Sequence, residues 1–231
     1  MTGYGPRRIP FPTEQRFRTT SMLYVILDNE MRIASRERSH GDPSVTGIGL
    51  CNLLEDHRMV ESLMESIPRC RSVTSEMIRE QRLIRRYGWE DDLRSAHPDY
   101  VDLSGPWLLE EIIIRKGDVL IMNEHRDRRL DDWAYVVDLD SGRMEVHRGF
   151  NMARVLPDER FYDGSRPNDG GFYPFKQLFS FSLNNIPPDD DFIKMCEWDR
   201  KPQHPREWPL MERYRSPITD PVILDAFNRR R

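Results

Sequence analysis

Apolar and polar positions follow the two-residue rhythm of β-strands in two parts of this chain, and each part predicts a hairpin. Residues 22–27 are apolar throughout, Asp28-Asn29-Glu30 supplies turn chemistry, and residues 31–35 alternate as a return strand. Residues 133–139 are apolar on both faces, as expected of an interior strand. Asp140-Ser141-Gly142 then predicts a hairpin turn that leads into an alternating partner strand at residues 144–148.

Helical spacing dominates between the two hairpins. Apolar residues three and four positions apart predict a helix over residues 50–67, which Pro68 ends, and a second helix near residues 73–87. A third helix is expected from Pro106 to Gly117, because proline suits the first helical position. The remaining predicted elements are strands at residues 119–122 and 175–183 and a short helix at residues 192–197.

These elements predict an α+β fold, in which a mixed or antiparallel sheet of hairpins packs with about three helices around a single core. The 231 residues are enough for one sizeable core. Residues 1–20 carry prolines and no periodic pattern, so we expect an extended lead-in before the globular domain at residues 21–198. Residues 199–231 are rich in proline and arginine and predict an irregular C-terminal wrap or tail.

Charge is distributed unevenly along the chain. The whole chain has a net charge of −4, but residues 1–20 and residues 199–231 each sum to +3, which leaves −10 on the central body. An acidic body is a poor surface for phosphates, so nucleic acid is not an expected partner. The basic ends could bind an acidic partner or be solvated tails.

The compartment is expected to be the cytoplasm or the nucleus. No stretch approaches the roughly 18 consecutive apolar residues of a membrane span, and the N-terminus lacks an apolar segment typical of a secretory signal. Cys51, Cys70 and Cys196 are too few and too widely spaced for a disulfide framework or a zinc ribbon. We therefore expect three reduced thiols and no membrane association.

Two stretches resemble a group of proteins from filamentous fungi, bacteria and phages. The first runs from Leu23-Tyr24-Val25-Ile26-Leu27 through a His-Gly-Asp-Pro loop to Gly47-Ile48-Gly49. The second, more specific stretch is Trp133-Ala134-Tyr135-Val136-Val137-Asp138-Leu139, followed by a Gly-Phe-Asn exit at residues 149–151. The resemblance covers roughly residues 20–60 and 130–190. It implies the limits of the domain and no reaction, because no activity is attached to the group.

The glycine-rich loop from Ser39 to Gly49 is one candidate for chemistry. His40 and Asp42 lie on it just before a predicted helix, where free backbone N–H groups could bind an anion beside an acid–base pair. The loop contains no Gly-x-Gly-x-x-Gly and no Gly-Lys-Ser/Thr motif. Its glycines equally suit a plain connection from strand to helix.

Glu145 and His147 form a second candidate, because two residues two positions apart on a strand face the same side. With Asp138 on the partner strand they could make a carboxylate–histidine–carboxylate group on a rigid scaffold. The same pattern is typical of the solvent face of a hairpin. His125, Asp127, Asp131 and Asp132 lie among three arginines, which indicates a salt-bridged segment rather than a metal site.

The sequence thus leaves the function open and predicts no cofactor and no metal. Without a recognisable catalytic motif, the favoured hypothesis is a non-enzymatic interaction or regulatory module with a protein partner. The alternative is a small-molecule-binding protein or a hydrolase-type enzyme. Its pocket would lie between the His40 loop and the central hairpin, with catalytic residues drawn from His40, Asp42, Glu145 and His147.

Overall fold

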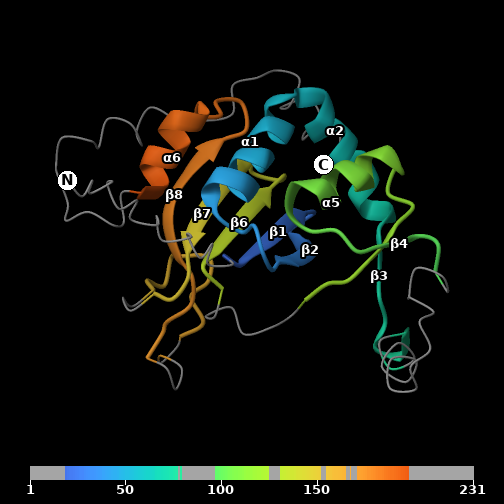
Figure 1. The fold of residues 1–231 in the computed structure, drawn as a ribbon, viewed down its shortest axis with the longest axis horizontal. Helices are drawn as coiled ribbons and strands as arrows, with labels where there is room; N and C mark the ends of the chain where they lie inside the picture. Colours follow the sequence, from blue (N-terminus) through green and yellow to red (C-terminus); the bar gives the residue numbers. More distant parts are fainter. Residues whose placement is uncertain are drawn as a thin grey trace, which may run out of the picture.

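A mixed five-stranded sheet in the order β2-β1-β6-β7-β8 forms the centre of the protein (Figure 1). The computed structural model describes residues 19–77, 79, 97–124, 131–151, 155–164, 167 and 171–197. The strands are β1 (Ser21–Leu27), β2 (Glu30–Glu37), β6 (Trp133–Asp138), β7 (Arg143–Arg148) and β8 (Lys176–Ser182). Strands β1 and β6 run parallel, and every other neighbouring pair is antiparallel. The predicted α+β class and both predicted hairpins are confirmed.

The two hairpin turns lie beside each other because β1 and β6 are parallel and in register, Ile26 opposite Asp138. Asp28 and Asn29 both have positive φ (60° and 58°), the backbone of a tight two-residue hairpin turn. The carboxylate of Asp140, in the second turn, accepts the backbone N–H groups of Asp28 and Asn29 at 2.9 and 2.7 Å. The side chain of Asp140 therefore connects the two hairpin turns, which lie at the same end of strands β1 and β6.

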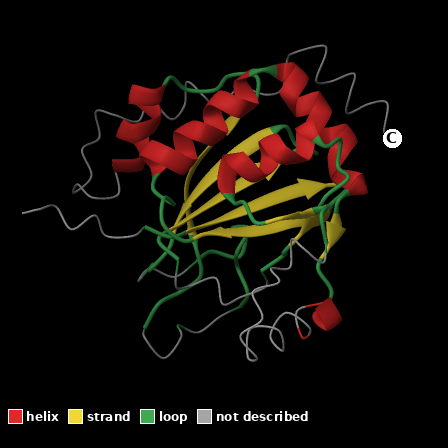
Figure 2. Cartoon of the chain, turned by 45° about the vertical axis from the view of Figure 1, so that its right-hand side comes forward, coloured by secondary structure: helices red, strands yellow, loops and turns green. Residues whose placement is uncertain are grey.

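Four helices cover one face of this sheet, as Figure 2 shows. They are α1 (Ile48–Glu55), α2 (His57–Ser66), α5 (Gly105–Ile114) and α6 (Asp189–Glu197). Alternate residues of the strands, such as Val25, Tyr135 and Val146, are fully buried beneath them. The main core therefore lies between the helices and the sheet, and it is the single core that the sequence predicts.

The predicted helix over residues 50–67 is divided, which corrects that prediction. Asp56 has an extended backbone (φ −83°, ψ 107°), and its side chain accepts the backbone N–H of Arg58 at the start of α2. The apolar spacing continues through the break, so periodicity alone could not reveal it. Most of the predicted helix at 73–87 lies outside the described residues, as do the predicted lead-in before residue 19 and the C-terminal wrap.

The glycine-rich segment after β2 is also more regular than the sequence predicts. Residues Pro43–Gly47 form a π-helical turn (η1) that runs directly into α1, where a loop to Gly49 is expected. Two glycines here allow close packing of helices. A Cβ at Gly47 would lie 2.6 Å from the ring of Phe192 in α6, and a Cβ at Gly49 would lie 2.8 Å from Cγ of Pro106 in α5.

A smaller parallel sheet lies beside α5 and α2, with β5 (Leu120–Ile121) between β3 (Arg71–Ser72) and β4 (Tyr100–Val101). The face of the large sheet opposite the helices carries a second, smaller apolar cluster that includes Tyr24, Val136, Phe161 and Phe175. In the described part of the chain, no helix is both long enough and apolar enough to cross a membrane.

Candidate functional site

His40 and Asp42 lie at the end of the hairpin where β2 runs into η1, and both have local structural contacts. The backbone N–H of His40 donates to Oε1 of Glu37 at 3.2 Å, while the His40 side chain is 61% exposed. Oδ1 of Asp42 accepts the N–H of Ser44 at 3.1 Å and also the Ser44 hydroxyl, which caps the N-terminus of η1. These contacts are those of a strand-to-helix connection.

Glu145 and His147 form a buried ionic network on the face of the sheet opposite the helices. Oε2 of Glu145 lies 2.9 Å from Nε2 of His147 and accepts Nε–H of Arg160 at 2.8 Å. Nη2 of Arg160 also bridges Oε1 of Glu145 and Oδ2 of Asp138, each at 2.6 Å. The side chain of Asp138 thus joins Glu145 and His147 as the sequence suggests, although the group is enclosed rather than solvated: His147 is 0% exposed.

The network fixes the charge states of its members. Burial alone would raise the pKa of Glu145, but the hydrogen bonds and charges of His147 and Arg160 outweigh it and lower that pKa to about 2. Burial lowers the pKa of His147, so the imidazole stays neutral and donates from Nε2 to Glu145. Its Nδ1 is buried and has no hydrogen-bond partner among the described residues.

The structure separates these two pairs of candidate residues instead of bringing them together. Tyr135, which faces the helices, donates its hydroxyl hydrogen to the backbone oxygen of Gly41 at 3.1 Å, so the His40 loop packs on the helical side. His147 lies opposite Ala134 and projects from the other side of the sheet. A hollow of about 180 Å³ does lie beside the loop, bordered by Trp133 of β6 and by α6, and it is lined by Asp42 but not by His40, Glu145 or His147.

The acidic residues before β6 have structural partners. Asp131 is buried and accepts Nε–H of Arg36 at 2.6 Å, and Oδ2 of Asp132 accepts the N–H of Thr20 at 2.9 Å. His125 and Asp127 lie outside the described residues. Within the described ranges, no group of three or more His, Cys, Asp or Glu side chains could hold a metal ion.

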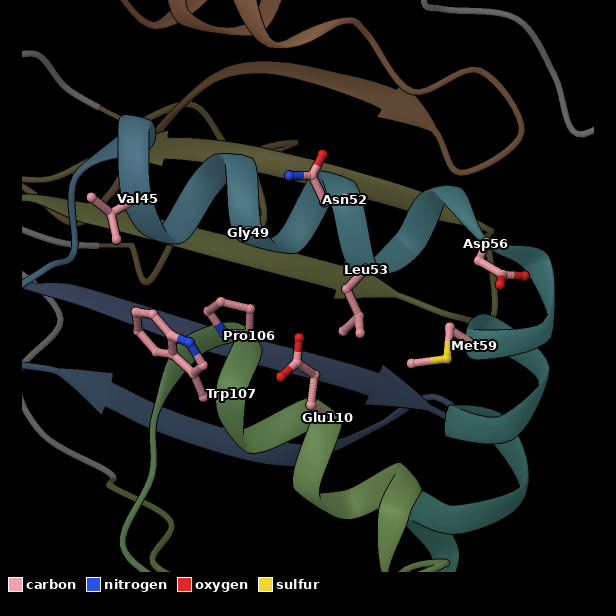
Figure 3. A pocket seen from close by; sticks show the side chains of 9 residues that line it. All are labelled: Val45, Gly49, Asn52, Leu53, Asp56, Met59, Pro106, Trp107 and Glu110. Atoms are coloured by element: carbon pink, nitrogen blue, oxygen red, sulfur yellow. The ribbon is translucent and has the colours of Figure 1, made fainter.

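A groove between α1, α2 and α5 is larger than the hollow beside the His40 loop. Its volume is about 460 Å³, within the range of roughly 300–1,000 Å³ that is usual for ligand sites. In Figure 3, Leu53 of α1 and Met59 of α2 point toward the gap that faces α5, and Trp107 and Glu110 border it from the α5 side. The complete lining is Val45, Gly49, Asn52, Leu53, Asp56, Met59, Pro106, Trp107 and Glu110.

Local sequence explains why α5 presents both an apolar and an acidic group to this groove. Leu108, Leu109 and Ile112 are buried against the sheet and orient the helix. Trp107 and Glu110 are three residues apart and therefore share another face, on which the Trp107 side chain is 41% exposed. The close approach of Gly49 to Pro106 sets how near α1 and α5 lie at this end of the groove.

The polar groups of the groove divide into those paired within the chain and those exposed to solvent. Both carboxylate oxygens of Asp56 are bound by Arg58, at 3.1 and 2.8 Å. In contrast, Asn52, Trp107 and Glu110 are exposed and make no side-chain hydrogen bond or ion pair with any described residue. The groove therefore offers a free carboxylate, a free amide and an indole N–H around an apolar floor.

The sequence interpretation did not single out any of these three residues. The sequence does contain one signal that points to Trp107. On the helix predicted from Pro106 to Gly117, Trp107 and Ile114 are seven positions apart and lie outside the apolar stripe. Both are exposed, by 41% and 73%, and Trp107 is the one that lines the groove. The groove itself forms only because α1 and α2 pack near α5, and the sequence pattern does not predict that packing.

Comparison of the chain with family models, with curated proteins and with solved structures gave no match. The resemblance to the fungal, bacterial and phage group therefore stays a prediction.

Proposed function

We propose that this protein is a non-enzymatic interaction module that binds a protein partner through the groove between α1, α2 and α5. The observation that carries the proposal is the exposed Trp107 in a groove that also holds Asn52 and Glu110, whose side chains make no hydrogen bond or ion pair with the described residues. Partly exposed aromatic residues over apolar pockets are the side chains that contribute most to protein interfaces.

The positions of the four predicted catalytic residues favour an interaction module over a hydrolase. A hydrolytic site needs a nucleophile or activated water, a base and an oxyanion donor within reach of one reacting atom. Asp42 lies on the helical side of the sheet and His147 on the other side, and the carboxylates of Glu145 and Asp138 already pair with Arg160. These contacts are what a fold-stabilising network requires, so the proposal assigns no catalytic role to the four predicted residues.

The proposal also places the protein in the cytoplasm or nucleus. Its three cysteines are free thiols, of which Cys51 and Cys196 are buried. Burial raises the pKa of all three, that of Cys70 to about 11, so none is a reactive thiolate at neutral pH.

Affinity capture from lysate of the native host, at physiological salt, tests the proposal. The full-length chain and its Trp107→Ala variant serve as baits, and bound proteins are compared by quantitative mass spectrometry. We expect at least one specific partner to be reduced about tenfold by Trp107→Ala, because truncating a central aromatic contact removes more than about 1.4 kcal/mol.

Tyr162→Ala is the matched control, because it removes another exposed aromatic side chain, next to Phe161, whose ring packs on the opposite side of the sheet. Capture that is equal for all three baits would reject the groove as the binding site. Thermal unfolding of each bait shows that the variants remain folded, since both side chains are partly exposed.

A further inference from the structure

We propose that the partner presents a basic peptide segment to this groove and that an arginine or lysine side chain of that segment lies over Trp107 with its charge beside Glu110. This inference rests on the proposed function and names the chemistry of the partner.

The charge of the groove favours a cation. No Lys, Arg or His side chain lines it. Arg58 neutralises Asp56, so Glu110 supplies the uncompensated negative charge of the lining. An anionic ligand would be repelled by Glu110, whereas a cation gains an ion pair that costs no existing contact among the described residues. The central body carries −10, which also steers a basic segment toward the surface.

The aromatic and apolar groups favour a side chain with an aliphatic stem over a bare ion. The exposed indole of Trp107 can accept a guanidinium or ammonium group on its face. Leu53, Met59 and Pro106 form an apolar surface beside it, on which the methylene stem of lysine or arginine can pack. Glu110, three residues along the same helix, is close enough to pair with the charged end.

Asn52 favours a peptide over a free amine. Its exposed amide offers one acceptor and two donors, which match the N–H and C=O groups of an extended backbone. In Figure 3 its amide points away from α5, while Glu110 borders the gap from α5. A segment that leaves the groove across α1 could therefore bind its backbone to Asn52 and its cationic side chain to Glu110.

The test is selection from a random peptide library displayed on phage, with the immobilised full-length chain as target and Trp107→Ala as counter-target. We expect the enriched peptides to carry Arg or Lys next to Leu, Ile or Met. One enriched peptide, fluorescently labelled, is then titrated by anisotropy. Affinity should fall about fivefold with Glu110→Gln, about tenfold with Trp107→Ala, and further when its basic residues are replaced by glutamine.

Glu65→Gln is the matched control, because it removes an equal charge from an exposed position of α2 outside the groove. It should leave the affinity unchanged. An equal loss with Glu65→Gln and Glu110→Gln would mean that only the overall charge matters, which contradicts a specific pair at Glu110.

The remaining outcomes separate this inference from the proposed function. Enrichment of neutral or acidic peptides, or of none, overturns the basic-segment inference; the function survives if capture from lysate still depends on Trp107. The peptide is also titrated against a chain that ends at residue 198. If it binds this shortened chain but not the full-length chain, the basic segment 199–231 of the same chain occupies the groove. A dimer of the full-length chain that Trp107→Ala dissociates would assign it to a second copy. Either result would contradict the inference that a basic segment of a partner protein binds in the groove.

Discussion

At the scale of single residues, the buried group around Glu145 shows how charges remain stable on a covered sheet face. Arg160 reaches from the segment after β7 to two carboxylates, and His147 hydrogen-bonds one of them. The ring of Phe161 closes over His147 with centroids 4.8 Å apart. Because each carboxylate has a donor, the cost of burying it is offset. The network fixes the covering segment to the sheet.

Acid is expected to lower the free energy of unfolding over two pH ranges because of this network. The pKa of His147 is lowered from 6.5 in the fold, so protons bind the unfolded chain more readily, and stability should begin to fall below about pH 6.5. The pKa of Glu145 is lowered from 4.5 to about 2, so a contribution of about 3 kcal/mol, present above pH 4.5, is lost as the pH falls toward 2.

Urea unfolding between neutral and acid pH measures this dependence. The Glu145→Gln variant should be less stable at neutral pH and should lose less stability than the wild type below about pH 4.5. Burial would raise the pKa of Glu37, but hydrogen bonds from Ser104, Ser39 and His40 outweigh it and lower that pKa, and this contribution is common to both proteins. A wild-type stability that stays level from neutral pH to pH 3 would contradict the assigned network.

At the scale of elements, the sequence predicts what local patterns determine. The two hairpins follow from alternation and turn residues such as Asp28-Asn29, and α5 follows from Pro106 at its start and Gly117 beyond its end. The break at Asp56 and the π-helical turn before α1 were missed, because both depend on capping and on the close approach of other helices. The groove was missed because α5 is distant in sequence from the adjacent helices α1 and α2, with which it forms the groove.

The end of α5 gives a test of this local reasoning. Gly117 has a φ of +78°, and a Cβ there would lie 2.0 Å from the backbone oxygen of Ser66. Gly117→Ala should therefore destabilise the fold by more than about 2 kcal/mol, since backbone strain and a collision add. Gly171 has a similar φ of +82° but open space around it, so Gly171→Ala should cost only about 1 kcal/mol. Equal unfolding midpoints in urea would show that the contact with Ser66 is absent.

At the scale of the whole molecule, the two sides of the sheet have different roles in this account. The side away from the helices is covered by aromatic residues and a neutralised ionic network, which stabilise the fold. The helical side contains the main core and, outside it, a groove with exposed polar groups beside an exposed tryptophan. Partner binding is therefore expected on the helical side.

Hydrogen–deuterium exchange of the full-length chain, alone and with the partner captured from host lysate, tests this claim most directly. The account predicts slower exchange on binding at residues 45–59 and 106–110, the segments that form the groove. Residues 143–148 and 155–164, on the other side of the sheet, should be unchanged. Protection on those two segments, with none at the groove, would contradict the account.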